Sequence, residues 1–79
     1  MKVMWKEENN KLVLEKQFEN FNEAWRFLNG VALLAEQNQH HPTIQNTFNN
    51  VKLELTTHDS GNTITDKDRD LASKIEKLF

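Results

Sequence analysis

Hydrophobic and polar residues alternate along two stretches at the start of the chain. In the first, residues 2–6, Val3 and Trp5 fall on one face of an extended backbone. In the second, residues 11–18, leucine and phenylalanine side chains fall opposite glutamate and glutamine. The intervening EENN at 7–10 ends in two asparagines, which tolerate the left-handed conformation of tight turns. The pattern predicts two antiparallel strands joined as a hairpin.

The apolar residues then recur at the spacing of a helix. They follow steps of three and four: Phe21, Ala24, Trp25, Leu28, Val31, Ala32 and Ala35. Asn20 precedes this stripe as a suitable N-cap, and Glu23, three residues later, can complete a capping box. Pro42 cannot continue the helix and disfavours a helical conformation at His41. The two adjacent histidines are therefore expected where the chain leaves the helix.

Two more strands and a second helix complete the pattern. Residues 43–48 and 51–57 flank an asparagine pair at 49–50, and the second of these strands alternates strictly between apolar and charged or polar side chains. Thr65 is a suitable N-cap for a last helix with an acidic first turn. Its apolar stripe consists of Leu71, Ala72, Ile75, Leu78 and Phe79. The order ββαββα predicts a two-layer α+β fold in which a four-stranded antiparallel sheet carries two helices on one face.

Length and composition narrow the class of protein. The 79 residues make one domain, 1–79, too small for a deep internal pocket, so a site is expected in a shallow groove or between subunits. A net charge of -2 argues against direct nucleic-acid binding. No apolar run is long enough for a membrane span or a signal peptide, and cysteine is absent. A cytoplasmic protein without membrane contact, disulfides or thiolate chemistry is expected.

The three histidines are the candidate reactive groups. His40 and His41 are adjacent, and His58 closes the fourth predicted strand. Imidazole can donate or accept a proton near neutral pH, which suits general acid–base catalysis in a solvent-reached groove. Three imidazoles could also bind zinc, but the sequence lacks the His-x-His or His-x3-His spacing that aims two rings at one ion. No metal is therefore expected.

Each of these residues also has a purely structural interpretation. His40 could complement the dipole of the helix that it ends, and His58 could be ordinary polarity at a strand end. Asp68 lies three residues after Thr65, where a carboxylate bonds back to the cap. Glu36 and His40 form an i,i+4 pair that is often only a contact on the helix surface.

The spacing of these residues resembles the pterin-4a-carbinolamine dehydratase family. The family's hallmark is a glutamate, three residues, His-His-Pro, an aromatic residue, a Thr-His pair closing a strand, and an aspartate opening the last helix. The matching residues here are Glu36, His40, His41, Pro42, Phe48, Thr57, His58 and Asp68. The resemblance extends from about Trp5 to the end of the chain.

The resemblance implies an enzyme that dehydrates 4a-hydroxytetrahydrobiopterin to quinonoid dihydropterin, recycling the cofactor of aromatic amino acid hydroxylases. The pterin is the substrate, so neither a cofactor nor a metal is implied. Carried over, His40, His41 and His58 are catalytic, and the substrate-binding residues are Pro42, Thr57, Asp68 and Glu36. We expect His40 and His58 to act as the acid–base pair and His41 to contact the substrate.

Two further expectations concern partners. The family forms homodimers or homotetramers, and Trp25, Phe27 and Leu34 lie outside the apolar stripe or at its margin, which leaves apolar surface for a second copy. The alternative to an enzyme is a non-catalytic dimerisation or accessory module on the same fold, because a related form in animals serves as a transcriptional dimerisation cofactor.

Overall fold

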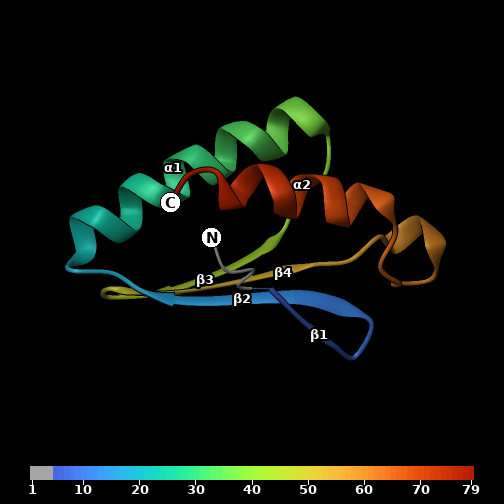
Figure 1. Ribbon diagram of the computed structural model, residues 1–79, viewed down its shortest axis with the longest axis horizontal. Coiled ribbons are helices and arrows are strands. Elements are labelled where there is room, and N and C mark those ends of the chain that lie inside the picture. The colour runs from blue at the N-terminus through green and yellow to red at the C-terminus, as the bar shows by residue number, and fades with distance from the viewer. Residues whose placement is uncertain (1–4) are drawn as a thin grey trace.

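The computed structural model describes residues 5–79 as a sheet covered on one face by two helices (Figure 1). In chain order the elements are β1 (Lys6–Glu8), β2 (Lys11–Gln17), α1 (Phe21–Asn38), β3 (Thr43–Thr47), β4 (Asn50–Leu55), the short 3-10 helix η1 (His58–Ser60) and α2 (Asp66–Glu76). All neighbouring strands pair antiparallel, in the order β1-β2-β4-β3. The predicted ββαββα two-layer α+β fold is confirmed.

The first hairpin is shifted from its predicted position. β1 occupies Lys6–Glu8, whereas the predicted strand at 2–6 falls mostly outside the described residues. The turn consists of Asn9 and Asn10 alone, with φ of 51° and 63°. Two successive left-handed residues suit the twist of a two-residue hairpin. The two glutamates before them therefore belong to the strand, and their assignment to the turn was wrong.

The second hairpin turns one residue earlier than predicted. Thr47 pairs with Asn50, so the turn residues are Phe48 and Asn49 rather than the asparagine pair 49–50. Phe48 has a φ of 51°, which is unusual for a bulky side chain. The amide of Asn46 donates to the carbonyl oxygens of Phe48 and Asn50 at 3.2 and 3.0 Å and holds the turn. Propensity alone assigns the left-handed positions to asparagine. Pairing of Asn49 with Phe18, whose N–H donates to Asn49 O at 2.8 Å and whose carbonyl oxygen accepts from the Asn49 amide at 2.8 Å, overrides it.

The core lies between the sheet and the helices. Its fully buried side chains include Leu14, Val51, Leu53 and Leu55 from the sheet and Ala24, Val31, Leu71 and Ile75 from the helices. The alternation predicted for β4 is confirmed, because its inward residues are buried and the intervening ones are half-buried. Burial of this apolar face fixes the register of β4 and hence the point at which the chain leaves the sheet toward η1.

Helix α1 buries a face slightly rotated from the predicted one. Asn20 caps the helix as predicted, since its Oδ1 accepts a hydrogen bond from the Glu23 N–H at 2.9 Å. Phe27 is buried, whereas Phe21 and Trp25 are about half exposed and stack on each other with ring centroids 5.8 Å apart. Phe21, Trp25 and the exposed Ala32 were wrongly included in the buried stripe.

The residues after α2 pack differently from a helical stripe. The helix ends at Glu76, so Leu78 and Phe79 lie beyond it and remain partly exposed. The Phe79 ring stacks on Phe27 at 4.9 Å between centroids, and Leu78 covers Gly30 on α1. These contacts hold the end of the chain against α1. Because the two helices run in opposite directions, the end of α1 lies beside the start of α2 (Figure 1). Within residues 5–79, neither helix is long and apolar enough to cross a membrane.

Candidate active site

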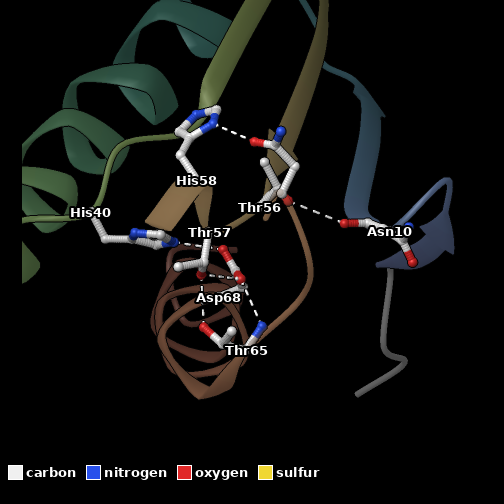
Figure 2. Close-up of polar contacts among 8 residues, drawn as sticks. Asn10, His40, Thr56, Thr57, His58, Thr65 and Asp68 are labelled. Carbon is white, nitrogen blue, oxygen red and sulfur yellow. Dashed lines mark hydrogen bonds and ion pairs between the residues drawn. The ribbon is translucent and has the colours of Figure 1, made fainter. Parts of the chain in front are cut away.

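A buried carboxylate lies at the base of the candidate site. Asp68, in the first turn of α2, has no exposed surface. Its Oδ2 accepts a hydrogen bond from the backbone N–H of Thr65 at 2.9 Å and another from the hydroxyl of Thr57 at 2.7 Å (Figure 2). The return bond to the N-cap residue is the capping contact predicted from the spacing of Thr65 and Asp68. The two threonine hydroxyls also lie 2.7 Å apart.

His40 pairs with the other oxygen of the Asp68 carboxylate, Oδ1. Its Nε2 lies 2.5 Å from Asp68 Oδ1, and its side chain is only 12% exposed (Figure 2). The chain turns at Gln39, which has a left-handed φ of 50°, and the N–H of His40 closes the helix by donating to Ala35 O at 3.1 Å. This cap aims the ring at the start of α2. The sequence predicted a histidine in a solvent-reached groove, and His40 is more deeply buried than that.

The charge state of Asp68 determines which ring nitrogen of His40 carries a hydrogen. Burial raises the pKa of Asp68, but the hydrogen bonds from His40, Thr65 and Thr57 outweigh it, and the pKa lies below its ordinary value of 3.8. An ionised carboxylate can only accept hydrogen bonds. Nε2 of His40 therefore carries a hydrogen, which it donates to Asp68 Oδ1.

His41 has a different carboxylate partner. Its Nε2 lies 2.8 Å from Glu36 Oε2, and both side chains are exposed. The sequence suggested Glu36 and His40 as a pair on the helix surface, and that pairing is wrong. The helix ends at Asn38 and the left-handed residue after it redirects the chain, so Glu36 meets His41 instead. The adjacent histidines are thus held by two separate carboxylates.

His58 has a neutral partner. It begins η1, after Thr56 and Thr57, which follow β4, and its Nδ1 lies 2.6 Å from Oδ1 of Asn62. The ring is exposed, and the close-up places it above Thr57, on the opposite side from the buried carboxylate (Figure 2). Nothing in the sequence pattern singled out Asn62, because the contact depends on the loop that returns from η1.

The three histidines line one open groove of about 310 Å³. The other lining residues are Gln39, Thr56, Thr57, Asp59 and Lys67. Asp68 lies behind His40, Glu36 lies beyond His41, and Pro42 is half-buried in the link between α1 and β3. Sequence reasoning missed four lining residues that lack a distinctive motif: Gln39, Thr56, Asp59 in η1 and Lys67 in the first turn of α2. Across residues 5–79, no group of three histidine, cysteine or acidic side chains is arranged to hold a metal ion.

A larger hollow lies on the sheet and is lined mainly by charged and amide side chains. It measures about 500 Å³ and includes Glu15, Gln17, Gln45 and Lys52 from the face opposite the helices. No histidine lines it. The smaller groove is therefore the candidate active site, because it alone combines the three imidazoles with a buried carboxylate.

Comparisons with known proteins match nearly the whole chain to one family. Residues 1–78 fit the family described as Pterin 4 alpha carbinolamine dehydratase. A "Putative pterin-4-alpha-carbinolamine dehydratase" of Prochlorococcus marinus (strain NATL2A) is 50% identical over 75 residues, which cover 95% of this chain and 78% of that protein. A protein of the same name from Thermomicrobium roseum (strain ATCC 27502 / DSM 5159 / P-2) is 46% identical over 74 residues, covering 94% and 78%.

Solved structures share the fold. A transcriptional coactivator/pterin dehydratase from Brucella melitensis superposes with a TM-score of 0.88 at 31% identity, covering 95% of this chain and 81% of that one. A pterin dehydratase-like protein identified as a RuBisCO assembly factor in the alpha-carboxysome gives a TM-score of 0.79 at 22% identity, covering 94% and 87%. The second likeness is one of fold alone.

Proposed function

The chain belongs to the pterin 4 alpha carbinolamine dehydratase family, and on that premise we propose that it dehydrates 4a-hydroxytetrahydrobiopterin to quinonoid dihydropterin and water. In this role it recycles the pterin cofactor of aromatic amino acid hydroxylases in the cytoplasm. The pterin is substrate, and the reaction uses neither a metal nor a further cofactor.

One observation carries the proposal. Three imidazoles from two different parts of the chain converge on one groove, and the most buried of them is paired with a fully buried, ionised Asp68. Burying a carboxylate is costly unless its oxygens are satisfied, and here both are. A fold that needed only stability could fill this position with an apolar side chain. The arrangement supports an acid–base function at the groove.

The reaction needs one proton at the leaving oxygen and one acceptor for the proton of the ring nitrogen beside C4a. The C4a–O bond breaks as water departs, the N–H electron pair forms the new C=N bond, and the proton gained by the enzyme balances the one given. We assign the acid to His40, because its hydrogen bond to the buried, ionised Asp68 holds the ring at the groove. We assign the base to His58, whose partner is an uncharged amide.

The remaining residues take supporting roles. His41 contacts the pterin, with Glu36 orienting its ring and Pro42 restricting the backbone before it. Thr57 and Asp68 were expected to bind substrate, and their contacts support a different role. Thr57 is buried, with 5% of the residue exposed, and its hydroxyl donates to Asp68. Both residues therefore act through His40 rather than through the substrate.

A non-catalytic accessory module is the second candidate. It is favoured by the half-exposed, stacked pair of Phe21 and Trp25 on α1, which offers apolar surface to a partner. The two candidates differ in what they require of the groove. An enzyme must bind the pterin there, whereas an accessory module requires only the apolar surface of α1.

The experiment is to add the purified protein to freshly generated 4a-hydroxytetrahydrobiopterin and follow quinonoid dihydropterin by ultraviolet absorbance. Acceleration above the spontaneous rate supports the enzyme. A second arm titrates a stable dihydropterin while recording the histidine ring signals by NMR. Absence of both acceleration and ring-signal changes would contradict the enzyme and favour the accessory module.

A further inference from the structure

We infer that Asn62 is a positioning residue that holds His58 in the tautomer with hydrogen on Nδ1, so that Nε2 is the free acceptor nitrogen. The inference deepens the assignment of His58 as base and, in its catalytic consequence, rests on the proposed function. The observation behind it is the 2.6 Å contact between His58 Nδ1 and the side-chain oxygen of Asn62.

The loop after β4 is built to bring these two side chains together. The N–H of Thr57 donates to Thr63 O at 2.9 Å, and the N–H of Asn62 returns to Thr57 O at 3.0 Å. The N–H of Gly61 donates to His58 O at 3.1 Å. Gly61 and Asn62 are both left-handed, with φ of 75° and 60°. The chain therefore doubles back so that the Asn62 amide lies against the ring four residues earlier.

The chemistry of an amide oxygen fixes the tautomer. This oxygen can only accept, so the ring nitrogen that faces it must donate a hydrogen. A neutral imidazole carries one hydrogen, which leaves the other nitrogen with a lone pair. Within residues 5–79, Nε2 of His58 has no hydrogen-bond partner. Asn62 thus leaves this nitrogen available to take a proton.

The rings of His40 and His41 are held through Nε2, whereas the ring of His58 is held through Nδ1. His40 and His41 both present Nε2 to carboxylates, Asp68 and Glu36. A carboxylate favours the imidazolium, whereas a neutral amide orients a ring without adding charge. His58 is therefore the one histidine of the groove that is oriented as a neutral acceptor, which matches the base in the proposed reaction.

The test replaces Asn62 with residues that tolerate its left-handed backbone. Asn62→Gly removes the amide at a φ that glycine adopts freely, and Asn62→Asp keeps an acceptor oxygen. Asn9→Gly is the matched control, since Asn9 is also left-handed, with a φ of 51°, but lies in the β1–β2 turn. The other charged and titratable groups that line the groove, His40, His41, Asp59 and Lys67, are the same in every variant.

Long-range nitrogen–proton NMR of the His58 ring, recorded where the ring is neutral, identifies the protonated nitrogen without any substrate. We expect hydrogen on Nδ1 in the native protein and in Asn9→Gly, a mixture of tautomers in Asn62→Gly, and recovery of the native tautomer in Asn62→Asp. Loss of one neutral hydrogen bond should lower kcat/KM about tenfold in Asn62→Gly, with KM changing little.

Hydrogen on Nε2 in the native protein, or an unchanged tautomer in Asn62→Gly, would overturn the inference. An unchanged kcat/KM in Asn62→Gly, despite the altered tautomer, would overturn its catalytic consequence. The expected tautomer pattern in a native protein that does not accelerate dehydration would instead contradict the proposed function and still support the role of Asn62 at His58.

Discussion

His40 and Asp68 are 28 residues apart in the sequence, and 2.5 Å separates Nε2 of the first from Oδ1 of the second. The histidine leaves the end of α1 and the aspartate lies in the first turn of α2, so the pair joins the two helices at one end of the molecule (Figure 1). The contact serves both the packing of the helices and the orientation of an imidazole. Its removal should therefore be visible in stability as well as in activity.

We predict that His40→Ala lowers the free energy of unfolding by about 2 kcal/mol, because it leaves the buried Asp68 carboxylate short of a partner. The matched variant His41→Ala should change stability by less than about 0.5 kcal/mol, since its ion pair is exposed. Urea denaturation followed by circular dichroism measures both. Equal stability of the two variants would contradict the structural role of His40.

The second prediction concerns the loss of folding stability at acidic pH. Because the folded Asp68 has a pKa below its ordinary value of 3.8, its ionised form stabilises the folded protein at neutral pH. That contribution is lost as the pH falls from about 3.8 through the lower value of the folded state. The stability difference between the native protein and Asp68→Asn should thus shrink on acidification over this range. Denaturation experiments from pH 6 to pH 2 measure this difference in the free energy of unfolding. A difference that stays constant over that range would contradict the prediction.

The fold was largely predictable from the sequence because its pattern is local. The strand alternation in 51–57 and the caps at Asn20 and Thr65 depend on neighbours within a few residues. The face that α1 buries was less predictable. A stripe of mixed aromatic and alanine residues admits two close rotations, and packing of Phe27 against the end of the chain selects one.

The sequence predicted most residues of the candidate site but not which of them contact each other. The resemblance named Glu36, and helical spacing paired it with His40. The left-handed residue that ends α1 instead directs His40 to Asp68 and Glu36 to His41. Asn62 and Lys67 were missed because the connection at 56–65, with two left-handed positions, brings Asn62 to His58 and the first turn of α2 to the groove, and no short motif encodes that return.

Thr57 provides the third prediction. Replacing its hydroxyl by a methyl group in Thr57→Val removes one of the two hydrogen bonds to Asp68 Oδ2. We expect kcat for dehydration to fall about tenfold with little change in KM, because the residue acts through Asp68 and His40. Thr47→Val, on the exposed edge strand β3, is the control. A rise in KM with unchanged kcat would show that Thr57 contacts the pterin directly.

The fourth prediction is self-association. Of the residues expected to leave apolar surface, Trp25 is half-exposed, whereas Phe27 is buried and Leu34 packs against the core. Phe21 and Leu33 of α1 add to the surface of Trp25 that a monomer would expose to water. We expect sedimentation at tens of micromolar to give a homodimer or homotetramer. Trp25→Glu should shift the distribution toward smaller species, whereas Lys52→Glu, on the opposite face of the sheet, should not. A native protein that sediments as a monomer would contradict the prediction.

The central claim is that the histidines act together as one acid–base site, and stopped-flow rates of dehydration test it most directly. We predict that His40→Ala and His58→Ala, each shown to be folded, slow the reaction by about 10²–10⁴-fold. The variant lacking both should be little slower than the poorer single variant, because groups that act as a unit are not additive. Full activity in His58→Ala would contradict the three-histidine site.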